Sequence, residues 1–370
     1  MAQPWGLFIL FTLAIVLLCV WGGVMTALQA LRPPRKMFAW ALATGRPKDP
    51  SDLGLRFDDV QYSSGQRHPC PAWCISGDAQ NTDAPIVVML HGWGRSRWDS
   101  LTRVEPFRKV CSEIVLLDLP AHGEHAGAWS GVGTSEPQCV LHVLQEIAQQ
   151  FPKRALILAG HSMGAGVAVR AANLANNEID SGTVLRAIKK VDDMPAQSPT
   201  HLSHNMNPND QAKSQAKSQA NSQAKSKANH PLHSHATRGI GIAGVIAFAP
   251  YSTLRSPIPA RLALQNLPAW PFAPIAFLML RMLGRMDAAL EIDTRTLRAP
   301  LLVIAGDRDP ISPLADARAI ANAAPHGTLV VVAYQRHDDL REGDPKKFDD
   351  ALAEFLKSIT VPLAATSGSL

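Results

Sequence analysis

The longest apolar run of the chain lies close to its N-terminus. The segment Trp5–Ala27 contains no charged residue. As a helix rising about 1.5 Å per residue it would span about 35 Å, enough to cross a bilayer core of about 30 Å. A cleaved signal peptide is the alternative, but the segment has no basic region in front of it and its apolar part is too long. We therefore expect residues 1–36 to form an uncleaved, single-pass membrane anchor.

Shorter apolar runs follow, and each is typical of a strand that is buried on both faces of a parallel sheet. They occupy residues 86–90, 114–117, 156–159, 244–249, 301–305 and 329–332. A patchier alternation predicts an antiparallel hairpin at the edge of the sheet, formed by residues 55–62 and 71–75. Helical periodicity lies between the runs, most clearly at residues 138–150. This order predicts an α/β fold with a mostly parallel central sheet flanked by helices.

The run at residues 156–159 ends in Gly160-His161-Ser162-Met163-Gly164, and a small-residue segment with helical character follows. This Gly-x-Ser-x-Gly pattern is typical of a nucleophile elbow, a sharp strand-to-helix turn with serine at its tip. The backbone is strained there and larger neighbours would clash, which explains the glycines. The N–H groups at the start of the helix point to where negative charge develops in acyl transfer. An ordinary Gly/Ser turn is the alternative for the pentapeptide alone.

Further motifs stand at the ends of the predicted strands. They are His91-Gly92-Trp93-Gly94, Asp118-Leu119-Pro120-Ala121-His122-Gly123, Gly306-Asp307-Arg308-Asp309-Pro310-Ile311-Ser312-Pro313 and, near the end of the chain, His337. Together with the elbow, and in this order, they resemble the α/β-hydrolase superfamily, in its serine esterase and lipase-like branch of monoacylglycerol lipases and lysophospholipases. The resemblance covers residues 55–358, with one insertion. It implies the α/β-hydrolase fold and acyl transfer at a serine.

A serine hydroxyl is a weak nucleophile and needs a base to take its proton. The family order is serine, acid, histidine, so the resemblance makes Ser162 the nucleophile, Asp309 the acid and His337 the base. Asp309 has the family's spacing from the loop glycine and proline, and it would orient the imidazole. Asp307 lies too close to the strand end and is expected to be a turn residue. The family often has glycine before the histidine, where this chain has Arg336.

The resemblance also assigns the donors that would hold the oxyanion, namely the backbone N–H groups of Trp93 and Met163. His91 and His122 lie in glycine turns, where a structural role is expected. His161 points away from the serine hydroxyl in related proteins. This chemistry requires no metal ion and no organic cofactor.

An insertion over residues 177–238 interrupts the resemblance. Its centre repeats a four-residue unit of the form Gln-Ala-Lys-Ser without a large apolar residue, which predicts disorder. In the family, a cap over the active site is inserted where residues 251–295 stand, and we expect these residues to form a small helical cap. Residues 37–54 are expected to be a linker, and residues 359–370 a C-terminal tail.

The composition limits which binding partners and which cysteine chemistry we expect. The net charge of +5 is modest, and no interleaving of basic and aromatic residues supports nucleic-acid binding, so we expect no nucleic-acid partner. The five cysteines are odd in number and have no metal-ligand spacing. We expect free thiols, with a disulfide between Cys70 and Cys74 as the alternative.

These observations predict a membrane-anchored serine hydrolase that cleaves carboxylic esters, and the anchor and the apolar cap favour lipid-like ones. Acyltransferase, thioesterase or peptidase chemistry would use the same residues. A non-catalytic, membrane-tethered scaffold is the alternative from another class. Because Arg32, Arg35 and Lys36 follow the anchor, the positive-inside rule places the catalytic domain in the cytoplasm. The expected partners are a small-molecule ester or lipid-like substrate and the membrane, and the sequence leaves the oligomeric state open.

Overall fold

The computed structural model describes residues 4–79, 83–181, 240–286, 289–338 and 340–366. The chain divides into two units, the first of residues 1–177 and 240–370 and the second of residues 178–239. Apart from the end of one helix, the second unit lies outside the described residues. The disorder expected for residues 177–238 therefore falls almost wholly outside them.

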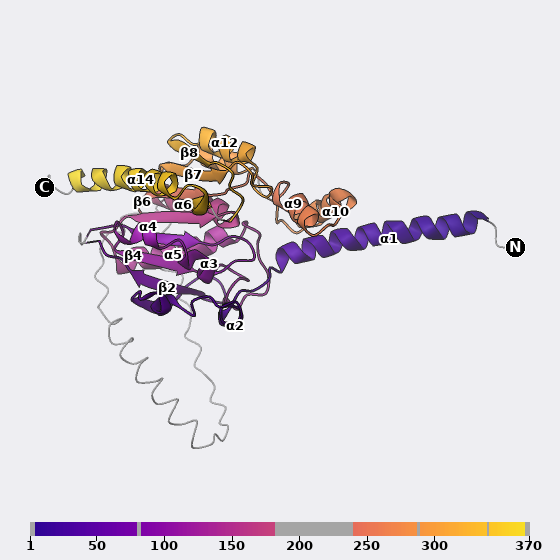
Figure 1. Ribbon diagram of the computed structural model, residues 1–370, viewed down its shortest axis with the longest axis horizontal. Coiled ribbons are helices and arrows are strands. Elements are labelled where there is room, and N and C mark those ends of the chain that lie inside the picture. Colours follow the sequence, from indigo (N-terminus) through magenta and orange to yellow (C-terminus); the bar gives the residue numbers. More distant parts are fainter. Residues whose placement is uncertain (1–3, 80–82, 182–239, 287–288, 339, 367–370) are drawn as a thin grey trace, which may run out of the picture. The chain divides into compact units, whose positions relative to one another are not determined.

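One sheet of eight strands forms the centre of this unit, in the order β1-β2-β4-β3-β5-β6-β7-β8 (Figure 1). The strands are β1 (Phe57–Tyr62), β2 (Cys70–Ser76), β3 (Ile86–Leu90), β4 (Glu113–Leu117), β5 (Leu156–His161), β6 (Ile242–Phe248), β7 (Leu301–Gly306) and β8 (Gly327–Val332). β1 and β2 pair antiparallel at one edge, and the strands from β4 to β8 in this order pair parallel. The prediction of a mostly parallel sheet with an antiparallel edge hairpin is confirmed.

Continuous apolar strands are needed because helices cover both faces of the sheet. Along β3, Ile86, Val88 and Leu90 pack with helices α5 (Glu136–Gln150), α6 (Met163–Ser181) and α12 (Leu314–Ala323). The alternate residues, Val87 and Met89, pack with α3 (Arg97–Leu101), α4 (Glu105–Arg108) and α14 (Pro345–Thr366). Every residue of β3 is buried, so a polar side chain at any of its positions would lose its hydration in the core.

Two segments differ from expectation. The expected linker contains a short helix, α2 (Phe38–Ala43), and a 3₁₀ turn, η1 (Pro50–Leu53). Its Ala41 is fully buried in the core on the α14 side of the sheet, so this stretch is packed rather than extended. The expected C-terminal tail begins inside α14, which continues to Thr366.

The expected free thiols are confirmed, because all five cysteines are free and none of them forms a disulfide.

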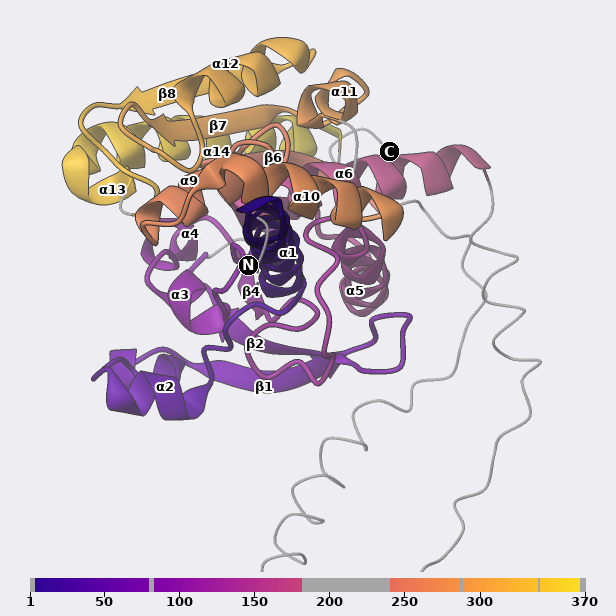
Figure 2. The ribbon, with the colours of Figure 1, turned by 90° about the vertical axis from the view of Figure 1, so that its right-hand side faces the viewer.

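The cap segment forms α9 (Pro257–Leu264), α10 (Ala269–Met282) and α11 (Leu290–Arg295). The N-terminal apolar run forms α1 (Pro4–Leu31), which is the one helix in the described part of the chain that is long and apolar enough to cross a membrane. α1 packs against α10, and the two lie side by side in Figure 2. At the contact, a Cβ atom on Gly22 would lie 2.5 Å from the ring of Phe272, and one on Gly23 would overlap Ile275. The two glycines therefore allow this close approach.

Candidate active site

The turn between β5 and α6 holds Ser162 in the strained conformation that the sequence predicted. Its φ is 55°, in the left-handed region, and its N–H donates to the carbonyl of Phe248 at 2.8 Å. A side chain at Gly160 would overlap the carbonyl oxygen of Gly164. One at Gly92 would lie 3.2 Å from Ser162 Cβ. The glycines around the serine are thus required by close approaches of the backbone.

A similar close approach at Gly164 gives a test of folding. A Cβ atom at Gly164 would lie 2.6 Å from the carbonyl oxygen of His91 and closer still to that of Leu90, and backbone cannot move aside cheaply. We expect Gly164→Ala to lower the free energy of unfolding by about 1–3 kcal/mol, as overpacking does. Chemical denaturation of the purified protein in detergent measures this.

The same helix provides a matched control. At Gly166 the nearest atom to an added Cβ lies 3.8 Å away. Gly166→Ala should therefore be neutral, or stabilising by up to about 1 kcal/mol through the higher helix propensity of alanine. Equal denaturation midpoints for the two variants would contradict the close packing described at Gly164.

Three loops at the carboxyl edge of the parallel strands bring Ser162, His337 and Asp309 together. Ser162 follows β5, Asp309 follows β7 and His337 follows β8. His337 Nε2 lies 2.9 Å from Ser162 Oγ, and His337 Nδ1 lies 2.7 Å from Asp309 Oδ2. All three residues are buried. Because a carboxylate only accepts, the geometry assigns the ring proton to Nδ1 and leaves Nε2 free to accept from the hydroxyl.

Asp309 is held in place by its own loop. Its Oδ1 accepts the backbone N–H groups of Ile311 at 2.8 Å and Ser312 at 2.9 Å, so Oδ2 remains for the histidine. Asp307, the other acid of this loop, is exposed, and its N–H donates to the carbonyl of Val332. The structure therefore brings Asp309, and not Asp307, to His337.

His161 has a role that the sequence analysis missed. Its Nε2 lies 2.8 Å from the carbonyl oxygen of His337, which can only accept, so His161 donates there. Burial depresses the pKa of His161 well below its usual value, which keeps the ring neutral. The residue next to Ser162 in sequence thus positions the backbone of His337. The pattern Gly-His-Ser contains no signal for this bond, because its acceptor lies in a distant loop.

The other two histidines of the glycine turns are structural, as expected. His91 Nε2 accepts the N–H of Leu119 at 3.0 Å, and its Nδ1 lies 2.9 Å from the carbonyl of Gly92. Burial lowers the pKa of His91 to about 4. His122 Nδ1 lies 2.9 Å from the carbonyl of Pro120. Both rings stabilise loops near the site without reaching Ser162.

Trp93 and Met163, the expected oxyanion donors, both lie near Ser162, since Met163 follows it in the chain and Trp93 lines the same pockets. Met163 is the first residue of α6, so its N–H has no acceptor within the helix. Trp93 follows β3, and its N–H appears in no backbone hydrogen bond of the described residues. The indole Nε1 of Trp93 donates to the carbonyl of Ala30 at 2.7 Å. The loop that carries the Trp93 N–H is therefore tied to α1.

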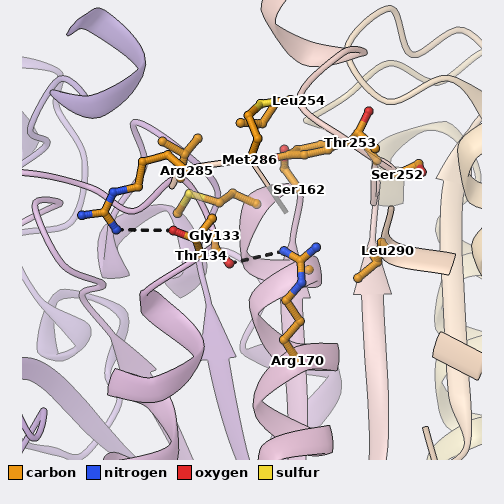
Figure 3. Close-up of a pocket in the computed structure, with 14 residues that line it drawn as sticks. Gly133, Thr134, Ser162, Arg170, Ser252, Thr253, Leu254, Arg285, Met286 and Leu290 are labelled. Carbon is orange, nitrogen blue, oxygen red and sulfur yellow. Dashed lines mark hydrogen bonds between the residues drawn. The ribbon is translucent and has the colours of Figure 1, made fainter. Parts of the chain in front are cut away.

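Ser162 lies in the lining of three pockets. The first lies beneath the cap (Figure 3) and is lined by Gly133, Thr134 and Leu290 among others. There the side chain of Arg170 donates to the carbonyl of Gly133 at 3.3 Å, and that of Arg285 to the Thr134 hydroxyl at 3.4 Å. These bonds tie α6 and the cap to the loop that precedes α5.

The second pocket has a mostly apolar lining. Its lining residues are Thr26, Gln29, Ala30, Trp93, Val132, Ser162, Tyr251, Leu254, Pro257, Ile258, Arg261, Leu262 and Gln265. The third is lined by charged groups, among them Lys36, Arg95 and Asp338. Lys36 and Arg95 both pair with Asp99. Ser162 thus adjoins one mostly apolar pocket and one that carries ion-paired side chains.

In the described part of the chain, His161, His337 and Asp338 form the one group of three ligand-type residues that could hold a metal ion. Both ring nitrogens of His337 already contact Asp309 and Ser162, and Nε2 of His161 donates to a carbonyl. A metal ion would have to displace these hydrogen bonds, so the donor set fits a metal poorly.

The sheet order, the cap after β6 and a serine at the β5–α6 turn define an α/β-hydrolase fold. The chain belongs to the alpha/beta hydrolase family, whose sequence profile matches residues 87–351. The comparison with curated proteins finds no match.

Similar solved structures share this fold. The esterase Pf2001 of Pyrococcus furiosus is 19% identical, with a TM-score of 0.59 over 89% of this chain and 97% of that one. Est1E of Butyrivibrio proteoclasticus, solved with ferulic acid bound, is 14% identical, with a TM-score of 0.51 over 82% of this chain and 99% of that one. At these identities the likeness concerns the fold alone.

Proposed function

We propose that this protein is a membrane-anchored serine hydrolase that cleaves carboxylic esters with lipid-like acyl chains. The observation that carries the proposal is the chain of contacts from Ser162 Oγ through the His337 ring to Asp309, at 2.9 and 2.7 Å. Family membership supports a hydrolase. The apolar pocket at Ser162 supports an acyl chain as the group that is bound.

The proposed reaction follows from these positions. Ser162 Oγ attacks the ester carbonyl carbon while His337 Nε2 takes the hydroxyl proton. The carbonyl oxygen becomes an oxyanion, which the N–H groups of Met163 and Trp93 stabilise. The bond to the alcohol then breaks, and His337 returns the proton to the leaving oxygen. Water repeats the sequence on the acyl-enzyme, giving the free acid and restoring Ser162. Asp309 orients the His337 ring and stabilises the imidazolium each time that it forms.

Labelling with a fluorophosphonate, followed by turnover of esters, thioesters and amides, tests this proposal. A reactive serine should be labelled, and esters should be the best substrates of the panel. Preferred turnover of a thioester or an amide would replace ester hydrolysis by thioesterase or peptidase activity at the same residues. An unlabelled, inactive protein that is folded would favour the non-catalytic scaffold.

Acyl-chain length gives a quantitative expectation. Each methylene buried in the apolar pocket contributes up to about 0.8 kcal/mol, or about fourfold in kcat/KM. We expect 4-nitrophenyl octanoate to exceed the acetate in kcat/KM by at least about tenfold, measured below the critical micelle concentration. A preference for the acetate would contradict a lipid-like substrate.

Membrane anchoring by α1 is part of the proposal. The side chains of its N-terminal half are large, apolar and exposed, as lipid-facing side chains are. The basic residues that follow support a cytoplasmic position of the domain under the positive-inside rule. We expect the domain to be digested by protease in inside-out vesicles and protected in intact cells or spheroplasts.

A further inference from the structure

The C-terminal turns of α1 form part of the wall of the apolar pocket at Ser162. Thr26, Gln29 and Ala30 line this pocket together with Ser162. Another part of the wall comes from α9, through residues such as Ile258 and Leu262. The helix that is long enough to cross a membrane therefore also reaches the reacting serine.

This end of α1 is fixed to the domain on several sides. The carbonyl of Ala30 accepts the Trp93 indole at 2.7 Å, and that of Leu31 accepts the N–H of Ser130 at 2.9 Å. Ala27 is fully buried in the cluster that α1 forms with the cap. Just over one turn before Ala27, Gly22 and Gly23 pack against α10. The pocket wall is thus a rigid continuation of the membrane helix.

The length of α1 places this wall relative to a bilayer. About 20 helical residues cross a hydrocarbon core of about 30 Å, so a span that begins at Trp5 ends near Val24. Thr26 to Ala30 then lie about 3–9 Å further along the helix, so this stretch begins within a headgroup layer about 5–7 Å thick and ends at its outer edge. Glycerolipid esters lie at this boundary between headgroups and acyl chains.

The cap supports the same placement. α10 packs on α1 at Gly22 and Gly23, inside the expected span, and lies beside it in Figure 2. On α10, Leu278 is 61% exposed and Met282 is 80% exposed. In water these side chains would form an unfavourable apolar surface together with α1, whereas lipid would cover both.

We propose that the pocket takes the acyl chain of an ester lipid directly from the bilayer, with α1 as one wall of the entrance. The anchor is then part of the substrate site. This inference rests on the proposed hydrolysis at Ser162 for its chemistry, but the entry of the acyl chain can be measured without turnover.

The first experiment uses the full chain in phosphatidylcholine vesicles and compares two substrates, a long-chain ester lipid in the bilayer and 4-nitrophenyl acetate in the water. Gln29→Trp and Ala30→Leu enlarge the side chains of the wall, and we expect each to lower the ratio of lipid to acetate turnover by at least about tenfold.

Leu17→Trp is the matched control. Leu17 is 59% exposed on α1 and lies outside the pocket, so the ratio should stay within about twofold of the wild type. An unchanged ratio in both wall variants would overturn the inference and leave hydrolysis at Ser162 intact. So would turnover of the long-chain ester from water but not from vesicles.

The second experiment does not depend on catalysis. The Ser162→Ala protein is reconstituted with a phosphatidylcholine whose acyl chain ends in a diazirine, irradiated, and mapped by mass spectrometry. We expect cross-links to the peptide that holds Leu254 and Leu262, two buried residues of the pocket, and their loss when Ala30→Leu is added. Cross-links confined to exposed residues of α1 and α10 would show that lipid does not enter, whether or not the protein hydrolyses esters.

Discussion

Ester turnover is expected to fall by at least about 10⁴-fold in the Ser162→Ala variant, together with complete loss of fluorophosphonate labelling. The removed Oγ is the atom that lies 2.9 Å from His337 Nε2. No other hydroxyl makes a hydrogen bond to that nitrogen in the described part of the chain. The residual rate would come from substrate binding and the backbone donors alone.

The loss must be separated from a folding defect. Alanine keeps the backbone of the turn and removes one buried oxygen, so the denaturation midpoint should change little. Ser358→Ala is a matched control, because Ser358 bonds within α14 to the carbonyl of Phe355, away from the pockets that adjoin Ser162. Labelling of the Ser162→Ala protein at the wild-type level would assign the nucleophile to another residue.

The strands were predictable from the sequence because burial on both faces selects unbroken apolar runs. The runs at residues 86–90 and 301–305 coincide with β3 and β7 to within one residue. The short helices α3 and α4 carry about one turn each, which is too little for a 3.6-residue period to appear in the sequence. The packed linker was missed for the same reason, since α2 has six residues.

The parts of the site that depend on the local backbone were predictable from the sequence. The contacts between distant loops were not predictable. The elbow is a local pattern, and Ser162 adopts the expected strained turn. The bond from His161 to the His337 carbonyl joins residues 176 positions apart, so no local pattern could indicate it. The same holds for α1. Its composition predicts a membrane helix, but its contacts with Trp93 and α10 depend on how the whole unit packs.

The choice between two acids in one loop gives the second large effect. We expect Asp309→Asn to lower kcat by about 10²–10⁴-fold. The two backbone N–H groups from Ile311 and Ser312 would keep the amide oxygen at the Oδ1 position. The amide nitrogen would then face His337 Nδ1 as a donor, which favours the tautomer with its proton on Nε2. That tautomer cannot accept the Ser162 proton.

Asp307→Asn is the matched control, because it makes the same chemical change two residues away on an exposed side chain. It should leave kcat within about threefold of the wild type, since Asp307 contributes a backbone N–H to Val332 and no contact to His337. Turnover of one soluble ester by both variants, at matched active-site concentration from fluorophosphonate titration, measures the difference. A larger loss at Asp307 would move the orienting role to that residue. Equal small losses in both variants would mean that His337 works as a base without a carboxylate partner. The denaturation midpoint is the control for folding, because a loop that loses its shape would also lower that midpoint.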